Sequence, residues 1–390
     1  MNKVQVAGVH MVKFAKPGKQ TSYRQMASEA ILGAVAEAGI KPSLVEQAYA
    51  GYVYGDSTSG QHALYDAFMT GIPLINVNNN CSSGSSALFL ARQAVQSGAV
   101  ECALAFGFEE MQPGALGSHW DDRESPFDSF LKVLDDMDYP TAPVALRCFG
   151  AAGHHYMKKY GATPDLFAKV AVKTRNHAAL NPYALFTSEM TVEQVMEAPV
   201  MYMDYLTRLM CCPPTCGAGA AIICSESFAK KNNINAGVEI VAQAMTTDTP
   251  ETWTCPINLV GADMTRRAAE QVYESAGIGV EEVDVVELHD CFTTNEVITY
   301  EGLGLCPEGG ATAFVDNGDN TYGGKYVVNP SGGLMSKGHP LGATGLAQCY
   351  ELVSQLRHTA GRRQVPNANI ALQHNLGLGG AAVVTMYRSI

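Results

Sequence analysis

An internal repeat constrains the fold of this 390-residue chain more than any other feature. A helix-like segment that ends in Ala-Gly-Ile, followed by a strand-like run, occurs once in each half of the sequence. The two copies cover residues 26–40 with 47–54 and residues 264–278 with 283–288. Glycine suits the left-handed cap that ends a helix, so we expect Gly39 and Gly277 to end these two helices. Such self-similarity predicts two structurally similar halves.

A second pair of equivalent segments lies further along each half. Cys81 stands in Asn-Cys-Ser-Ser-Gly and His339 in Gly-His-Pro-Leu-Gly, and each of these turns of mainly small residues precedes an amphipathic helix pattern. The predicted helices and closing strands are residues 88–96 and 218–224 in the first half, and 346–356 and 381–387 in the second. If the halves pack face to face, Cys81 and His339 converge on one cleft.

The spacing of equivalent positions locates an insertion in the first half. Cys81 and His339 are 258 residues apart, but Gly219 and Gly380, in or beside the closing strands, are only 161 apart. The first half therefore has about 97 additional residues, and the change from apolar strand rhythm to polar and aromatic residues places them at 113–212. We predict an α/β fold with mostly parallel mixed sheets. The expected domains are 1–112 with 213–235, an inserted loop domain at 113–212, and 236–390.

Composition excludes several classes of protein. The chain is 47% hydrophobic with a net charge of −12, so it is globular and a poor candidate for binding nucleic acid. Its 11 cysteines show no framework spacing and are expected to be reduced thiols. No leader, membrane span or C-terminal peroxisomal signal is recognisable. We expect a cytoplasmic protein without membrane insertion, with the peroxisome or mitochondrial matrix as alternatives.

Cys81 and His339 have the residue types and positions for nucleophilic catalysis. A thiol at a helix start experiences the positive end of the helix dipole, which favours thiolate, and free amides there can hold an oxyanion. A neutral imidazole beside a thiol can accept its proton. On position alone, Cys81 is equally compatible with a small buried cysteine, and His339 with a histidine that caps a loop.

Two further segments end predicted strands. His289-Asp290-Cys291-Phe292 follows the strand at 283–288, and His374-Asn375 with a glycine-rich run follows the strand at 368–373. Ligands bind at such carboxyl edges in open α/β sheets, and a second thiol there can act as acid or base. The first segment alone also fits an interior cysteine with a capping aspartate, and the second alone is a weak signal.

Other catalytic or metal-binding patterns are absent. The spacing of Cys211, Cys212 and Cys216, with His154 and His155, lacks the paired C-x-x-C of zinc sites. The serines after Cys81 do not form G-x-S-x-G, and no G-x-G-x-x-G joins a strand to a helix. These absences argue against a zinc site, a serine hydrolase and a nucleotide-phosphate loop.

The ordered set of these segments resembles the thiolase superfamily, and within it the sterol-carrier-protein-x (SCP-x) type. The resemblance covers essentially the whole chain. Besides the motifs above, it includes Glu301-Gly302-Leu303-Gly304-Leu305-Cys306-Pro307-Glu308-Gly309, Gly318-Asp319-Asn320-Thr321-Tyr322-Gly323-Gly324-Lys325 and Asn329-Pro330-Ser331-Gly332-Gly333. It implies the thiolase fold, with αβαβα layers and a loop domain inserted into the first half.

The resemblance also implies roles for site residues. Cys81 falls at the acyl-accepting nucleophile and His339 at the histidine that deprotonates it. Cys291 replaces the second acid/base cysteine of common thiolases, whose usual position holds His374 here. His289, with His339, would hold the thioester oxygen. The amide of Cys81 and an amide among Leu376, Gly377 and Gly380 would form a second oxyanion site.

The implied activity is cleavage of 3-oxoacyl-CoA with CoA through an acyl-Cys81 intermediate, or the reverse Claisen condensation, in fatty-acid or sterol side-chain metabolism. The resemblance implies no metal or redox cofactor, and coenzyme A is a substrate. The inserted domain would bind it, with Lys173, Arg175 and Asn176 as candidate contacts. The resemblance implies at least a homodimer, with a homotetramer as the alternative.

One local departure and two rival functions accompany this expectation. SCP-x chains usually have Ser-Asp-Gly-Ala-Ala where this one has Thr215-Cys216-Gly217-Ala218-Gly219. Condensing enzymes of the same fold lack the His289-Asp290-Cys291 pattern, and steroid side-chain aldolases lack the nucleophilic cysteine. A non-catalytic lipid-binding subunit would not need two thiols and two histidines at equivalent ends of a duplicated fold.

Overall fold

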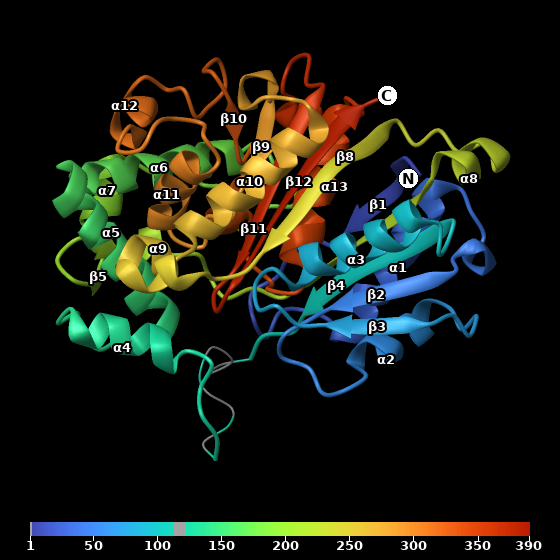
Figure 1. Ribbon diagram of the computed structural model, residues 1–390, viewed down its shortest axis with the longest axis horizontal. Coiled ribbons are helices and arrows are strands. Elements are labelled where there is room, and N and C mark those ends of the chain that lie inside the picture. Colours follow the sequence, from blue (N-terminus) through green and yellow to red (C-terminus); the bar gives the residue numbers. More distant parts are fainter. Residues whose placement is uncertain (1, 113–116, 118–119, 121) are drawn as a thin grey trace.

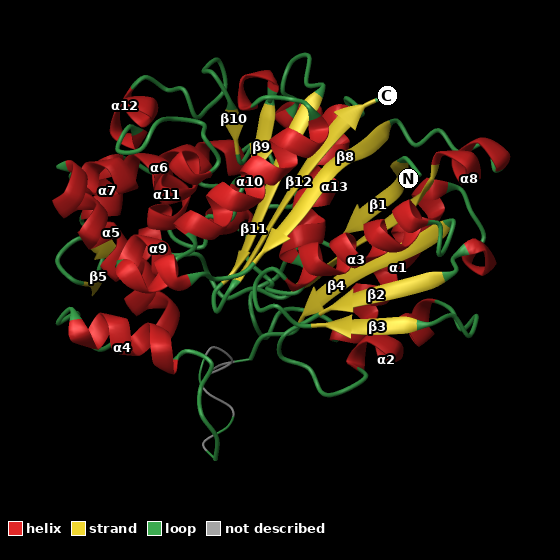
Figure 2. Cartoon of the chain, in the orientation of Figure 1, coloured by secondary structure: helices red, strands yellow, loops and turns green. Residues whose placement is uncertain are grey.

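The computed structural model describes residues 2–112, 117, 120 and 122–390 (Figure 1). Ten strands form a mixed sheet in the order β10-β9-β11-β12-β8-β1-β7-β4-β2-β3. Figure 2 shows these strands as two groups, one from each half of the chain, with helices around both.

The elements of the first half follow the predicted repeat. They are β1 (Val4–Met11), α1 (Tyr23–Ala38), β2 (Gln47–Gly51), α2 (Ser59–Ala67), β3 (Leu74–Val77), α3 (Ser83–Ser97), β4 (Cys102–Glu109), β7 (Gly217–Ser225) and α8 (Glu226–Lys231). Those of the second half are β8 (Val238–Thr246), α9 (Pro256–Leu259), α10 (Ala262–Ala276), β9 (Val285–Glu287), α11 (Thr293–Gly302), α12 (Ala311–Asp316), β10 (Val327–Val328), α13 (Thr344–Leu356), β11 (Ile370–Gly377) and β12 (Ala381–Ser389).

The strand order is symmetric about its centre. In each half four strands point the same way and one, β7 or β12, runs antiparallel to its neighbours. The halves join where β1 and β8 meet through the antiparallel pair Gln5 and Glu239. Equivalent strands therefore lie at equivalent distances from this join, as expected of two similar halves. The glycine caps are also confirmed, because Gly39 (φ 67°) and Gly277 (φ 63°) end α1 and α10 in the left-handed conformation.

Helices cover the strands in layers. On one outer face α1 packs on β1 and β7, and on the other α10 packs on β8 and β12. Between them, α3 and α13 pack against each other and against strands of both halves. Three clusters of buried apolar side chains fill the spaces between these layers. This arrangement confirms the predicted α/β class and its layering.

The segment between β4 and β7 contains most of the remaining elements. They are α4 (Asp128–Asp136), α5 (Val144–Tyr160), α6 (Pro164–Ala178), α7 (Val192–Met196) and the small antiparallel pair β5 (Val200–Tyr202) and β6 (Leu206–Thr207). Figure 1 shows this segment on one side of the molecule, where its helices contact α9, α11 and α12. Among the described residues, no helix is long and apolar enough to cross a membrane.

Candidate active site

Cys81 lies in the tight turn between β3 and α3. Asn80 before it has a positive φ of 51°, and the amides of Ser82 and Ser83 donate to the carbonyls of Asn79 and Asn80. The hydroxyl of Ser83 donates to the Asn80 carbonyl at 2.6 Å, which fixes the turn further. Because Cys81 precedes the cap of α3, its half-buried thiol projects beyond the helix end.

His339 is brought to Cys81 by contact between backbones of the two halves. Gly342, three residues after His339, packs so closely that an added Cβ would lie 2.4 Å from the Phe108 carbonyl and 2.6 Å from that of Gly51. Only glycine permits this approach. The loop carrying His339 is thereby held against the ends of β2 and β4, on the side where Cys81 lies.

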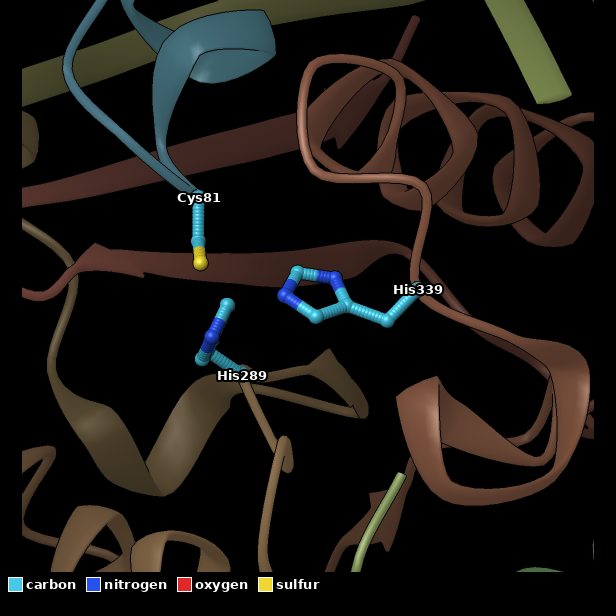
Figure 3. A group of neighbouring side chains, drawn as sticks. All are labelled: Cys81, His289 and His339. Atoms are coloured by element: carbon cyan, nitrogen blue, oxygen red, sulfur yellow. The ribbon is translucent and has the colours of Figure 1, made fainter. Parts of the chain in front are cut away.

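Three side chains from separate elements meet at this point. The sulfur of Cys81 and a ring nitrogen each of His289 and His339 all lie within 4.8 Å of one another. Figure 3 shows the three side chains pointing toward a common centre. The rings of His289 and His339 are edge to face, with centroids 4.9 Å apart. The predicted convergence of Cys81 and His339 is thus present, and His289 joins them.

The hydrogen bonds of His339 define its proton position. Thr344 Oγ1 lies 2.7 Å from Nδ1 of His339 and donates its proton to the Pro340 carbonyl at 2.9 Å. The hydroxyl must therefore accept from Nδ1–H, which leaves Nε2 as the unprotonated nitrogen. Among the described residues, Nε2 of His339 has no hydrogen-bond partner although the side chain is only 5% exposed. Nε2 of His339 thus has a free lone pair and can act as a base.

His289 presents the opposite character. Its Nδ1 lies 2.9 Å from Nδ2 of Asn375, whose Oδ1 accepts from the Ser85 hydroxyl at 2.8 Å. An amide nitrogen can only donate, so Nδ1 of His289 accepts and Nε2 carries the proton. The site therefore combines a hydrogen-bond donor, His289, with a base, His339.

The prediction that the helix dipole favours a Cys81 thiolate is wrong for the resting site. Burial, and secondarily the charge of Glu109, raise the pKa of Cys81 to about 12. Burial lowers the pKa of His339 to about 3. Both groups are neutral near pH 7, because removal from water outweighs the dipole of a helix that begins two residues later. Proton transfer from Cys81 to His339 must accompany the reaction.

Cys291 lies near this cluster, close enough to Cys81 for their charges to interact, and Cys212 is its neighbour. Cys211 and Phe292 form an antiparallel bridge, which places Cys212 opposite Cys291, and the Cys212 amide donates to the Cys291 carbonyl at 2.9 Å. Burial and the nearby thiols of Cys212 and Cys81 raise the pKa of Cys291 well above its usual value. Cys291 is therefore a protonated thiol beside Cys81.

Two family models together match most of the chain. The model for the thiolase N-terminal domain matches residues 4–208, and that for the thiolase C-terminal domain matches residues 251–387. The chain is also 54% identical over 393 residues to sterol carrier protein 2 of Rattus norvegicus, covering 99% of this chain and 72% of that protein. The chain belongs to the thiolase family. It is a thiolase of the SCP-x type, and hence an acyltransferase of lipid metabolism.

Solved structures confirm the thiolase fold. The structure titled Ltp2-ChsH2(DUF35) aldolase matches with a TM-score of 0.84 and 23% identity, covering 99% of this chain and 98% of that one. Human mitochondrial 3-ketoacyl-CoA thiolase in complex with CoA matches with a TM-score of 0.75 and 18% identity, covering 100% and 98%. At these identities the likeness concerns the fold alone.

His374, which was expected to be catalytic, makes hydrogen bonds to other protein groups in this thiolase. Its Nδ1 accepts from the His289 amide at 3.4 Å, and its Nε2 lies 2.9 Å from the Thr265 hydroxyl. Both ring nitrogens are therefore occupied by protein groups, and the side chain is fully buried. His374 therefore stabilises the backbone at His289, and its ring is not available to a substrate.

The predicted oxyanion residues lie where β11 meets the Cys81 turn. An added Cβ on Gly377 would be 2.1 Å from the Asn79 carbonyl, and Asn80 Nδ2 donates to the Leu378 carbonyl at 2.9 Å. The Gly380 amide donates within its own turn to Gly377 at 3.3 Å. Gly380 is thus the weakest of the expected donors, and the amides of Cys81 and Leu376 are the better candidates.

Two buried carboxylates hold the loops of this site together. Asp290 accepts from the amides of Leu334 (2.7 Å) and Met335 (3.4 Å), in the π-helix at Gly333–Lys337 that precedes His339. Glu109 accepts from the amides of Val53, Tyr54 and Gly342 at 2.9 to 3.1 Å. Burial raises the pKa of Glu109 to about 7. Each carboxylate connects segments that are distant in the sequence.

The three candidate CoA contacts differ in their exposure and in the groups that their side chains contact. Lys173 is 8% exposed and its ammonium is ion-paired with the buried Glu296, although its side chain borders the same hollow as Asn176. Arg175 donates to the Ser336 hydroxyl at 3.1 Å, and its guanidinium lies over the ring of Phe186. Asn176 is exposed and lines a hollow of about 490 Å³.

The departure at Thr215 and Cys216 has a clear structural consequence. The hydroxyl of Thr215 accepts from the His339 amide at 3.1 Å, and the Cys216 sulfur accepts from the Met111 amide at 3.2 Å. These side chains therefore anchor the backbone of His339 and the chain after β4. Both polar roles are filled without the aspartate usual in this position.

Several residues that contact the site were given no role at it from the sequence. They are Asn375, Thr344, Glu109, Thr215 and Cys212. Asn375 and Thr344 stand inside the motifs that carry His374 and His339, so their proximity to a catalytic group was a usable signal. Glu109 and Cys212 act through contacts with distant segments and give no local signal.

Proposed function

We propose that this thiolase cleaves 3-oxoacyl-CoA thioesters with CoA, with Cys81 as the acyl acceptor. The observation that supports this most is the meeting of a thiol, an unpartnered buried imidazole nitrogen and an imidazole N–H within 4.8 Å. Acyl transfer needs a nucleophile, a base and an oxyanion donor, and these three groups supply one each.

In the first stage, the sulfur of Cys81 attacks the 3-oxo carbon while its proton passes to Nε2 of His339. The amides of Cys81 and Leu376 stabilise the resulting alkoxide. When the alkoxide collapses, the bond between carbons 2 and 3 breaks and the acyl group stays on Cys81. The departing enolate of acetyl-CoA, or propionyl-CoA, keeps its thioester oxygen near Nε2–H of His289 and receives a proton from Cys291.

In the second stage, the thiolate of Cys291 removes the proton of an incoming CoA thiol. The CoA sulfur attacks the acyl-Cys81 thioester, and the acyl group leaves as a shortened acyl-CoA. Cys81 recovers its proton from the imidazolium of His339, so all groups return to their initial state. In the reverse direction the same groups perform a Claisen condensation.

The same proposal includes the partners expected from the sequence. CoA and acyl-CoA are substrates, Arg175 and Asn176 remain candidate contacts, and the cytoplasm is the proposed compartment. The protein is proposed to act as a homodimer or homotetramer. The edge strand β3 supports this, because Tyr65, Met69 and Ile75 on or next to α2 and β3 expose large apolar side chains.

The proposal is tested with a panel of 3-oxoacyl-CoA thioesters, from acetoacetyl-CoA to branched and steroid side-chain substrates, with and without CoA. We expect CoA-dependent loss of at least one substrate and its near-complete abolition in Cys81→Ala. Cys291→Ala should lower kcat by about 10²- to 10⁴-fold, since it removes a general acid. Cleavage of a 3-hydroxyacyl-CoA thioester without CoA would instead favour an aldolase, and inertness toward every substrate would favour a non-catalytic lipid-binding subunit.

A further inference from the structure

The cluster around Cys81 also has the composition of a metal site. Its three donor atoms are one sulfur and two imidazole nitrogens, all within 4.8 Å of one another. Tetrahedral zinc binds sulfur at about 2.3 Å and nitrogen at about 2.0 to 2.1 Å, so one sulfur and two nitrogen ligands lie roughly 3.3 to 3.6 Å apart. The separations between the three atoms therefore exceed those of a tetrahedral site by up to about one ångström. Small side-chain rotations can close this difference.

A second observation is the unpartnered nitrogen of His339. Within the described part of the chain, Nε2 of this histidine lacks a hydrogen-bond partner while 95% of the side chain is shielded from solvent. A buried lone pair without a proton donor costs free energy that a cation would recover. Figure 3 shows this ring directed at Cys81 and His289.

The groups behind the histidines suit metal binding. A metal-bound histidine usually donates its other ring N–H to an oxygen, and Thr344 Oγ1 already accepts from Nδ1–H of His339. For His289 to bind a metal through Nε2, its proton must move to Nδ1. The Asn375 amide has nearly the same shape when turned by half a rotation, and it then presents Oδ1 to that proton while Nδ2 faces the Ser85 hydroxyl.

We propose that Cys81, His289 and His339 bind one zinc ion, which reversibly inhibits the enzyme by occupying its nucleophile. Zn²⁺ replaces the thiol proton of Cys81, which is released to solvent, and each imidazole donates one lone pair. A water molecule completes the tetrahedron. Magnesium and calcium prefer oxygen ligands and are not expected to bind, since the three donors include no carboxylate.

The test uses Co²⁺ as a spectroscopic probe of the full-length protein. We expect one equivalent of Co²⁺ to give a thiolate-to-cobalt charge-transfer band with the visible bands of tetrahedral cobalt, and Zn²⁺ to displace it. Cys81→Ala should abolish the charge-transfer band, and His289→Asn, which removes a direct ligand, should weaken binding by more than the roughly 10- to 100-fold typical of losing an outer-shell partner. His154→Asn, on the outer helix α5, is the matched control and should leave the spectrum unchanged.

Binding is measured without turnover, so the result does not depend on the proposed acyl transfer. Activity then provides a separate readout, in which Zn²⁺ inhibits the wild-type protein and EDTA restores it. Absence of a charge-transfer band in folded wild-type protein, or its persistence in Cys81→Ala, would overturn the proposal. A band that disappears only when Cys211 or Cys255 is replaced would show that the metal binds elsewhere. This result would also overturn the proposal.

Discussion

At the scale of single residues, the resting nucleophile and base are both uncharged. Burial raises the pKa of Cys81 to about 12 and lowers that of His339 to about 3. Charge separation is therefore postponed until substrate is bound, when the oxyanion donors can compensate it. A thiol kept neutral in this way also reacts slowly with adventitious electrophiles.

The orientation of His339 depends on one hydroxyl. Thr344→Val keeps the shape of the side chain but leaves Nδ1–H of His339 buried without an acceptor, at a cost of about 1–3 kcal/mol. If the lost hydrogen bond destabilises the reactive orientation of the His339 imidazole, kcat should fall by about 10- to 100-fold with little change in KM. Thr344→Ser retains the hydroxyl and should restore most of the activity. Equal kcat values for the two variants would show that the hydroxyl does not position the base.

Glu109 should control the reactivity of Cys81 in a pH-dependent way. Its pKa is raised to about 7, so it becomes charged above this pH and then disfavours the thiolate of Cys81. Glu109→Gln should lower the pKa of Cys81 and accelerate its alkylation by iodoacetamide above pH 7, with little effect below. The adjacent Glu110→Gln is the control. Identical alkylation profiles for wild type and Glu109→Gln would contradict this interpretation.

At the scale of elements, a buried ion pair holds the inserted segment to the second half. Lys173 of α6 pairs with Glu296 of α11, the helix that follows the His289-Asp290-Cys291 segment, and both side chains are buried. Lys169, one turn earlier on α6, pairs with Asp165 and Asp316 at the surface. Both lysines therefore form ion pairs with carboxylates, but only the pair of Lys173 is buried.

Replacement of these lysines separates a structural role from CoA binding. Lys173→Met leaves the Glu296 carboxylate buried without its partner, so the free energy of unfolding should fall by about 3–5 kcal/mol. Lys169→Met should cost no more than about 1 kcal/mol, as is usual for exposed pairs. Urea unfolding monitored by circular dichroism measures both. A Lys173→Met protein of unchanged stability but raised KM for CoA would return Lys173 to the ligand site.

Local patterns predicted most elements but not the pairing between them. The Ala-Gly-Ile ends of α1 and α10 follow from the conformational freedom of glycine, and the closing strands from apolar runs. The burial of Lys173 could not be predicted, because its partner Glu296 is 123 residues away. The position of Cys212 likewise depends on the bridge between Cys211 and Phe292. Such contacts arise only when both halves are folded.

At the scale of the whole molecule, duplication explains where the site lies. The symmetric strand order places α3 and α13 side by side, so the turns that precede them, with Cys81 and His339, meet at one place. The repeat therefore allowed this convergence to be predicted. The thiol's ionisation could not be predicted, because the degree of burial is a property of the assembled protein.

The exposed side of β3 should be an interface between two copies of the chain. Ile75 on this edge strand is 37% exposed, and Met69 just before it is 74% exposed. Light scattering should give at least the mass of a dimer, and Ile75→Lys should shift it toward the monomer, because a buried unpaired charge is costly. Monomeric wild-type protein at micromolar concentration would exclude this interface.

The most direct test of the account is to identify the residue that carries the acyl group. Incubation with acetyl-CoA, followed by acid quenching and peptide mass spectrometry, should find one acetyl group on the peptide containing Cys81. CoA should remove it, and Cys81→Ala should not acquire it. An acetyl group on Cys291 or Cys212 in the wild-type protein, or turnover without any acylated cysteine, would contradict the account.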